Sequence, residues 1–442
     1  MAIQVKTIIN ADWIIPVVPK NTILENHSLI VNNDYILDIL PQNKVSEKYV
    51  SDEIHNLKGH AITPGFVNAH THLAMSLMKG FADDLPLHEW LNDYIWPAES
   101  EILSEEMVYD GTKLALAELI RGGVTCVNDH YFFPDKIVKC MNEIGIRGVV
   151  ANCIFNFPLP WAQNHINISV ENIKNLSGHP LIKAALGPHS PYVTDDMIMK
   201  KVCELSNQYK IPVHIHLHET TEEITTYKKK KGQSPIEYFD KQGWLNEYSI
   251  AVHVVHLTDH EAHILAKNKV SVVHCPESNM KLSSGKFPWD LLKKYEVNIA
   301  LGTDGSTSNN DLDMFGEIKT ASFLAKLQFG PKSMKSTEAL EMLTINGAKA
   351  LHLDHLIGSL EIGKKADFIS IDLHTPETLP IYNPISQLIY ACSRSQVKNV
   401  WCNGNQLMAK RALTTIDLEN IYIQQNIWKS KLINLKISSE KL

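Results

Sequence analysis

The residues most able to do chemistry in this sequence are histidines that recur at alternate positions. The chain has 442 residues, and 21 of them are histidine. His70 and His72 stand one residue apart at the end of an apolar run, and alternate residues of a β-strand share one face. Two imidazoles on one face can bind the same metal ion at about 2.0–2.1 Å. Taken alone, the pair is explained equally well by two unrelated core or surface histidines.

A second histidine group lies in the run IPVHIHLHE. His214, His216 and His218 alternate there, so we expect them to face the same way and one of them to be a third metal ligand. Glu219 follows at the turn, where its carboxylate could face the ion without binding it and could shuttle protons for a nearby water. The alternative for Glu219 is an ion-paired surface carboxylate.

Two later runs end in groups of the same kind. His253 and His256 close the run IAVHVVHL, and one of them could be a general base or an orienting donor while the other is a core histidine. Asp304 in LGTDG could supply an oxygen ligand, although Asp there is also a common helix N-cap. Three histidines and one aspartate around one divalent ion leave a position for water. Such a site suits metal-assisted hydrolysis or deamination.

Apolar runs that end in polar or ionisable residues are the elements that must position these groups. Eight such runs follow one another, and most are separated by helix-length segments. Strands that alternate with helices form a parallel sheet, and eight repeats favour a (β/α)8 TIM barrel of the α/β class over an open doubly wound sheet. In a barrel the C-terminal strand ends converge, which would gather the candidate residues. The runs are 61–72, 124–130, 147–155, 182–190, 211–219, 250–257, 270–279 and 297–305.

The two ends of the chain have a different pattern from the barrel region. Residues 1–60 read as short strands with turns, and strands and turns return in 357–442 before a helix over about 416–435. We therefore predict a metal-dependent barrel over 61–356. The segments 1–60 and 357–442 would form one small composite β-sandwich domain.

Composition and charge exclude several classes of function. Lys and Arg number 42 against 49 Asp and Glu, a net charge of −7, whereas nucleic-acid and anionic-membrane partners need a basic surface. No run of 18 apolar residues and no basic-then-apolar leader is present, so we expect neither a membrane span nor a signal peptide. Seven scattered cysteines without a C-x-x-C pair favour a reducing compartment. We expect a cytoplasmic protein.

These motifs together resemble the amidohydrolase superfamily. Within it, the sequence is similar to the 5′-methylthioadenosine/S-adenosylhomocysteine deaminases, a group that also includes triazine chlorohydrolases. The resemblance implies hydrolytic deamination of a small-molecule purine nucleoside at C6 of adenine, by a homodimer or larger homo-oligomer. The matching segments, in the family's order, are PGFVNAHTHLAMSLMKGFADDLPLHEWL, GPHSPYVT, HIHLHET, VHVVHL, HCPESNMKLSSG, ALGTDGSTSNNDLDMF and GSLEIGKKADF.

The resemblance also implies a metal site. His70, His72, His216 and Asp304 would bind one divalent ion per subunit, with zinc as the default and iron or manganese as alternatives. Relatives with two metals carry a bridging lysine at the end of strand four. This chain has His189 there, which implies one metal and a histidine that contacts the substrate.

Four acidic or basic groups receive roles in the reaction from the same resemblance. Glu219 would protonate the ring nitrogen N1, and it would bind the substrate in doing so. His253, together with Asp304, would orient and deprotonate the attacking water, which makes His256 the weaker candidate. Glu99 in WPAES would accept hydrogen bonds from the two ribose hydroxyls.

One departure from the family bears on the substrate. Some members hold the carboxylate of S-adenosylhomocysteine with arginines after strand three, but this chain has no Arg between Arg147 and Arg394. The loop FNFPLPWAQNHIN also lacks Lys, and an unpaired buried carboxylate is costly. We therefore expect 5′-methylthioadenosine or adenosine to outrank S-adenosylhomocysteine. A guanine-type base deaminase or a triazine chlorohydrolase is the alternative, and a non-catalytic scaffold is disfavoured because every ligand position is kept.

Overall fold

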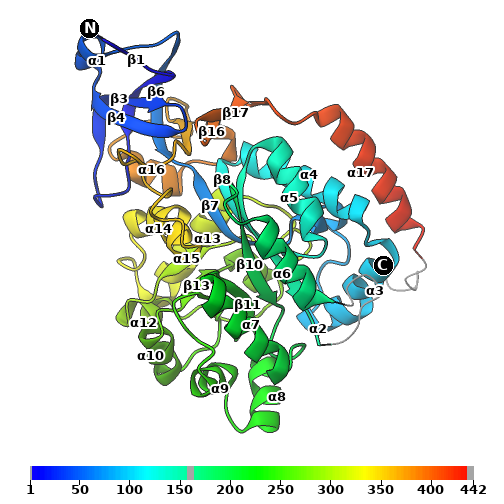
Figure 1. Cartoon of the computed structure of the whole chain (residues 1–442). Coiled ribbons are helices and arrows are strands. Elements are labelled where there is room, and N and C mark those ends of the chain that lie inside the picture. Colours follow the sequence, from blue (N-terminus) through cyan, green and yellow to red (C-terminus); the bar gives the residue numbers. More distant parts are fainter. Residues whose placement is uncertain (1, 157–163, 436–442) are drawn as a thin grey trace.

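The computed structural model describes residues 2–156 and 164–435, and at its centre lies a barrel of parallel strands (Figure 1). Eight strands hydrogen-bond in sequence order, and a parallel bridge between Thr71 and Asp304 joins the two ends of the sheet. This arrangement confirms the barrel predicted from the eight apolar runs. The strands are β7 (Phe66–Thr71), β8 (Val124–Tyr131), β9 (Arg147–Ile154), β10 (Ile182–Pro188), β11 (Val213–Leu217), β12 (Ser249–His253), β13 (Ser271–His274) and β14 (Ile299–Leu301).

Helices connect the strands and cover the outside of the barrel (Figure 1). Strands β8 and β9 are buried at every position, as expected where helices pack on one side and barrel side chains on the other. The helices of this region are α2 (Leu87–Glu89), α3 (Trp96–Ile102), α4 (Glu105–Arg121), α5 (Pro134–Ile144), α6 (His165–Asn175), α7 (Asp196–Tyr209), α8 (Thr221–Lys231), α9 (Pro235–Gln242), α10 (Asp259–Lys267), α11 (Pro276–Lys281), α12 (Trp289–Lys294), α13 (Met314–Phe329), α14 (Ser336–Leu343) and α15 (Ile345–Ala350).

Both ends of the chain build a second sheet beside the barrel, which confirms the predicted composite β domain. The C-terminal strands meet the N-terminal ones where β15 pairs antiparallel with β6, and the eight strands hydrogen-bond as one continuous sheet. Strand β6 crosses residue 60, the end of the N-terminal part as predicted, and continues through Gly65 into the barrel. In sheet order the strands are β18 (Ala412–Leu413), β17 (Asn405–Ala409), β16 (Val397–Cys402), β15 (Phe368–Asp372), β6 (Glu53–Pro64), β2 (Thr7–Ile14), β3 (Leu24–Asn32) and β4 (Tyr35–Pro41).

A few further elements complete the chain. Two short strands, β1 (Ile3–Gln4) and β5 (Tyr49–Val50), pair with each other, and α1 (Val45–Lys48) contacts β5. Helix α16 (Pro384–Tyr390) packs against α14 and α13. The C-terminal helix α17 (Leu418–Ile433) confirms the helix expected over about 416–435. It contacts α4, where the indole of Trp428 donates a 2.8 Å hydrogen bond to Asp110.

A buried ion pair fastens the barrel to the terminal sheet. The guanidinium of Arg147, at the start of β9, donates to both carboxylate oxygens of Asp367 at 2.7 and 3.0 Å. Arg147 is 1% exposed, and Asp367 immediately precedes β15. The same carboxylate accepts the backbone amide of Asn403 at 2.7 Å. A buried pair that is satisfied in this way is costly to break by removing one partner.

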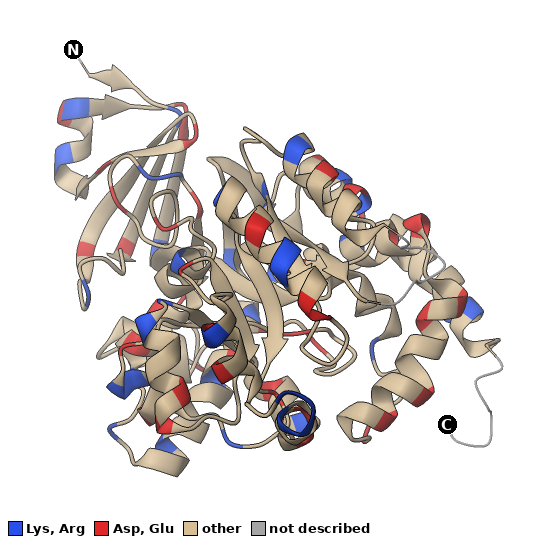
Figure 2. Ribbon diagram, turned by 60° about the horizontal axis from the view of Figure 1, so that its bottom comes forward, with Lys and Arg blue, Asp and Glu red and all other residues tan. Residues whose placement is uncertain are grey.

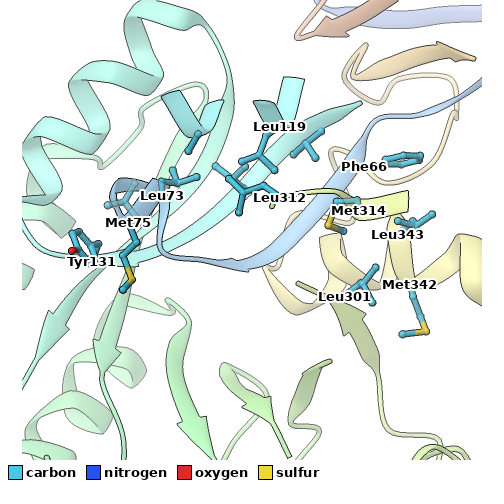
Figure 3. Close-up of a cluster of buried hydrophobic side chains, with 14 of the residues drawn as sticks. Phe66, Leu73, Met75, Leu119, Tyr131, Leu301, Leu312, Met314, Met342 and Leu343 are labelled. Atoms are coloured by element: carbon cyan, nitrogen blue, oxygen red, sulfur yellow. The ribbon is translucent and has the colours of Figure 1, made fainter. Parts of the chain in front are cut away.

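The main apolar core lies against the strand that carries the first two candidate ligands. Figure 3 shows Leu73, Leu119 and Leu312 lying close together beside β7, and all three are fully or almost fully buried. Phe66, at the start of β7, packs edge-on against Phe315 with ring centroids 5.1 Å apart. The end of β7 is therefore held between the barrel interior and a packed layer of helices.

Charged residues of both signs are interspersed over the outer helices, while the barrel strands carry few (Figure 2). Within residues 2–156 and 164–435, no helix has both the length and the apolar character needed to cross a membrane. All seven cysteines are buried free thiols.

Candidate active site

Four ligand-type side chains converge at the C-terminal ends of three barrel strands. His70 and His72 come from the end of β7, His216 from β11 and Asp304 from just after β14. One ligand atom of each lies within 4.8 Å of the others. The Nε2 atoms of His70 and His72 lie 3.1 and 3.3 Å from one carboxylate oxygen of Asp304. The predicted ligands are thus brought together, and three imidazole nitrogens with one carboxylate are a donor set that zinc accepts.

Hydrogen bonds on the far side of two imidazoles leave the ligand atoms free. The Nδ1 of His72 lies 2.6 Å from the carbonyl oxygen of His130, and the Nδ1 of His216 lies 2.7 Å from that of His189. A carbonyl only accepts, so each Nδ1 carries a proton and the other ring nitrogen, Nε2, faces the cluster. Backbone carbonyls that fix ligand tautomers in this way are a common feature of metal sites.

The remaining histidine ligand rests on a buried polar layer below the cluster. The Nδ1 of His70 lies 2.8 Å from the Nε2 of His214, whose Nδ1 in turn faces the side-chain amide of Asn128 at 3.0 Å. Burial lowers the pKa of His70 to about 4 and holds the pKa of His216 well below its ordinary value. Both imidazoles are therefore neutral at physiological pH, as a metal ligand must be.

The expectation that His214, His216 and His218 face the same way is wrong for the last of them. Strand β11 ends at Leu217, and His218 adopts a left-handed backbone with φ of 54°. Its ring turns away from the cluster: Nδ1 lies 2.8 Å from the carbonyl of His256, and Nε2 accepts the amide of Ile236 at 3.3 Å. The alternation rule holds only while the strand continues.

Asp304 is held by several donors besides the histidines. One carboxylate oxygen accepts from the hydroxyls of Ser278 and Ser308 at 2.7 and 2.9 Å, and the other accepts the amide of Gly305 at 2.8 Å. Burial raises its pKa, but the hydrogen bonds from His70 and His72 outweigh burial and hold the pKa well below the ordinary range. The N-cap alternative is wrong, because the next helix begins ten residues later and its cap is Asp313.

Glu219 and His253 stand together at the edge of the cluster. The parallel register of β11 and β12 places them near each other, and the Nε2 of His253 lies 3.8 Å from a carboxylate oxygen of Glu219. The Nδ1 of His253 lies 2.9 Å from the side-chain oxygen of Asn279, so Nδ1 carries a proton and Nε2 faces the site. Burial raises the pKa of Glu219. His256 instead binds the carbonyl of Ser284 at 2.6 Å, away from the cluster.

The cluster opens into a pocket of about 640 Å³ that also contains Glu99 and His189. Glu99 is 6% exposed and accepts a hydrogen bond from the hydroxyl of Tyr131. Burial raises the pKa of Glu99 to about 7 and lowers that of His189 to about 3. The rest of the wall is mostly apolar, and none of its described residues is Lys or Arg. Its large apolar members include Trp90, Leu91, Ile95, Trp96, Phe132, Phe155 and Leu282.

The loop invoked for tail selectivity falls partly outside the described chain. Residues 157–163 of FNFPLPWAQNHIN are not described; of the loop residues that are, Phe155 lines the pocket.

Several groups that support the site were not singled out from the sequence. Asn279, Ser278, Ser308 and Tyr131 each bind a candidate residue through a side chain. All four follow or end barrel strands, where polar residues gather in this fold. That position was the available signal, but their partners depend on how the loops fold.

Solved structures with the same architecture include deaminases and a chlorohydrolase. An adenosine deaminase from Xanthomonas campestris with bound zinc superposes with a TM-score of 0.97 at 39% identity, covering 98% of this chain and 100% of that one. An atrazine chlorohydrolase from Arthrobacter aurescens, complexed with zinc, has a TM-score of 0.85 over 96% and 99% of the two chains. Its identity is 19%, so this second likeness concerns the fold alone.

Sequence relatives cover almost the whole chain. A 5-methylthioadenosine/S-adenosylhomocysteine deaminase from Teredinibacter turnerae is 39% identical over 428 residues, 96% of this chain and 97% of that protein. A 5′-deoxyadenosine deaminase from Methanosphaera stadtmanae is 39% identical over 361 residues, 81% and 84% of the two chains. The family model described as amidohydrolase family matches residues 61–407. This chain belongs to the amidohydrolase family.

Proposed function

We propose that this protein is a zinc-dependent hydrolytic deaminase that converts an adenine nucleoside to the inosine-type product and ammonia. One observation carries the proposal: a cluster of three imidazoles and one carboxylate adjoins the Glu219–His253 pair in a pocket that also contains a third buried carboxylate, Glu99. The names of the two deaminase relatives, each 39% identical, support the reaction. The bound zinc of the Xanthomonas adenosine deaminase supports the metal.

His70, His72, His216 and Asp304 are the residues that would hold the ion. A bound divalent ion lowers the pKa of water from about 15.7 to about 7 and so supplies a nucleophile at neutral pH. Burial holds the pKa values of His70 and His216 below the ordinary value, so these two imidazoles are neutral, and Asp304 stays ionised, which suits a bound cation.

Glu219 and His253 would move the protons. Because Nδ1 of His253 is bonded to Asn279, its Nε2 is the ring nitrogen that can accept the proton that the attacking water loses. Glu219, whose pKa is raised by burial, can hold a proton and deliver it to N1 as oxygen adds to C6. The amino group then takes the proton from His253, the C6–N bond breaks and ammonia leaves. The added hydroxyl returns a proton to Glu219, and the ring becomes a hypoxanthine.

Glu99 would bind the ribose, and His189 would contact the substrate from the wall of the same pocket. A carboxylate that accepts hydrogen bonds from two hydroxyls matches a nucleoside diol, whereas a bare base or a triazine has none to offer. This is why we favour a nucleoside over the guanine-type and triazine substrates of other superfamily members. The apolar wall around Trp96 and Phe155 also favours a methylthio group or a plain ribose over the charged tail of S-adenosylhomocysteine.

The proposal also covers the oligomeric state and the cellular location. We propose a homo-oligomer, which rests on the family resemblance. We also propose a cytoplasmic location, which the seven unpaired thiols support because disulfides are rare in that compartment. The net charge of −7 supports a small-molecule substrate rather than a nucleic acid.

The test is an ultraviolet assay for adenine-to-hypoxanthine conversion by the purified zinc-loaded protein. 5′-Methylthioadenosine, adenosine and S-adenosylhomocysteine are compared, with guanine as the control substrate. We expect turnover of 5′-methylthioadenosine that is lost in Glu219→Gln while zinc content stays at the wild-type level. If none of the three nucleosides reacts, the substrate is a base or a triazine, and the role of Glu99 is the first assignment to discard.

A further inference from the structure

Glu219 stands on a short and unusual turn. Strand β11 ends at Leu217, the left-handed His218 follows, and α8 begins at Thr221 with Thr220 as its N-cap. A left-handed backbone is uncommon for a residue other than glycine, so other contacts must hold this turn. The contact between Glu219 and His253, at 3.8 Å, is too long for a hydrogen bond.

A second glutamate binds this turn through its backbone. One carboxylate oxygen of Glu223 accepts the amide of His218 at 2.9 Å, and the other accepts the amide of Glu219 at 3.0 Å. Glu223 is 5% exposed, and its own amide is bonded to the hydroxyl of Thr220 at 3.2 Å. The carboxylate thus spans the two peptide groups that place Glu219, from the first turn of the helix that follows.

The first turns of the neighbouring helices α9 and α10 have glutamates at the same position as Glu223, but these glutamates bind different amides. In a capping box, the glutamate three residues after the N-cap accepts the amide of the N-cap residue itself. Glu237 does so for Ser234 at the start of α9, at 3.0 Å, and Glu261 does so for Thr258 at the start of α10, at 2.8 Å. Glu223 has the same position in α8, but its carboxylate reaches past the cap to the two preceding amides.

We propose that Glu223 is a positioning residue for the proton shuttle: by holding the amides of His218 and Glu219, it fixes the Glu219 carboxylate relative to His253 and the metal cluster. The inference rests on the proposed function, in which Glu219 delivers the proton. Glu223 does not line the pocket, so it acts through Glu219 and not on the substrate.

Glu223→Gln tests this with little change of shape. The glutamine retains one acceptor oxygen, but its NH2 group faces an amide that also donates, so one of the two hydrogen bonds is lost. A displacement of about 1 Å at a reacting group can cost roughly 100-fold in rate, so we expect kcat to fall about 10- to 100-fold. KM and zinc content should stay near the wild-type values, because the apolar wall lies on other elements and the ring of His216 is held separately by the carbonyl of His189. Glu237→Gln is the matched control and should leave kcat unchanged, because glutamine also serves in a capping box.

Two readouts separate positioning from general support of the fold. In Glu223→Gln, the amides of His218 and Glu219 should exchange hydrogen faster than in wild type, as measured by mass spectrometry of a peptide spanning 214–224. The double variant Glu219→Gln/Glu223→Gln should be no slower than Glu219→Gln alone, because a residue that acts through Glu219 has no effect once the shuttle is gone. Multiplying losses in the double variant would overturn the proposal, as would a wild-type kcat in Glu223→Gln.

The test remains decisive if the glutamine variant does not fold. Glu223→Asp keeps the carboxyl group and withdraws it by one methylene, with the same expected results. In the wild-type protein itself the amides of His218 and Glu219 should exchange slowly. Rapid exchange there would refute the proposed hold of Glu223 on these two amides, and no variant is needed to show it. The exchange measurement needs no substrate, so it stands even if no adenine nucleoside reacts. The kinetic comparisons would then use whichever base or triazine the wild-type enzyme converts.

Discussion

Replacing Glu99 with glutamine should weaken nucleoside binding and stabilise the protein at the same time. Glu99 is almost fully buried, and burial raises its pKa from 4.5 to about 7 despite the hydrogen bond from Tyr131. At 1.36 kcal/mol per pH unit, this difference means that the fold disfavours the ionised carboxylate by about 3 kcal/mol. Removing the ionisable group therefore removes a destabilising contribution, provided that the side-chain volume is kept.

The pH dependence of this stabilisation has a definite sign. The folded pKa lies above the unfolded one, so the folded state binds the proton more tightly. The penalty is absent below about pH 4.5 and grows until about pH 7. Glu99→Gln should therefore melt a few degrees above wild type at about pH 8. The difference should shrink as the pH falls toward 4.5, as followed by thermal unfolding over a pH series.

Binding should change in the opposite direction. A hydrogen bond to a charged group is worth about 1.5–3 kcal/mol, so the variant's KM for 5′-methylthioadenosine should rise about 10- to 100-fold above pH 7. Below about pH 7 the wild-type Glu99 is itself protonated, and the two enzymes should become more alike. A 2′,3′-dideoxy analogue should show almost no difference between them. An unchanged kcat/KM on the best substrate together with an unchanged melting temperature would refute both the ribose role and the cost of burial.

Two further predictions concern the supports of the site and of the fold. Asn279→Leu removes the acceptor that fixes the His253 tautomer. We expect kcat to fall about 2- to 12-fold, as the 0.5–1.5 kcal/mol of a neutral hydrogen bond implies, and zinc loss in metal analysis would instead indicate a structural role. Arg147→Met leaves Asp367 buried and unpaired and should lower the free energy of unfolding by about 3–5 kcal/mol in urea titrations. Arg147→Met/Asp367→Leu should recover most of that loss, and a double variant as unstable as the single one would contradict this account.

The barrel could be predicted because the sequence of each strand is an apolar run with a polar C-terminal end. A run such as VTCVNDH is apolar along most of its length and polar toward its C-terminal end, and each of the eight runs overlaps a strand of the barrel. Parallel strands share the edge at which they end, so His70, His216 and Asp304 could be assigned to one place without any distance. Strand-and-turn patterns at both ends of the chain led to the prediction of one β domain, and the terminal strands do pair in one sheet.

Backbone conformations and hydrogen-bond partners beyond the strand ends could not be predicted. The left-handed backbone of His218 turns its ring toward Ile236, a consequence of where β11 stops that alternation cannot show. Glu223 reads in the sequence as an ordinary first-turn helix glutamate, and only the folded turn brings its carboxylate to the two preceding amides. Asn279 likewise gains its role from the loop that carries it to His253.

Three carboxylates in one pocket differ in protonation because their surroundings differ. Asp304 lies among imidazoles and hydroxyl donors, which hold its pKa well below the ordinary range. Its carboxylate therefore stays ionised and can bind a cation. Burial raises the pKa of Glu219, which suits a group that must hold a proton before giving it to a ring nitrogen. Burial raises the pKa of Glu99 to about 7, although its carboxylate already accepts a hydrogen bond from Tyr131. Hydroxyl groups of a ligand would donate further hydrogen bonds and so favour the ionised form. If so, nucleoside binding should lower the pKa of Glu99 and release a proton near pH 7. The heat of binding should then depend on the ionisation enthalpy of the buffer, and that dependence should disappear in Glu99→Gln.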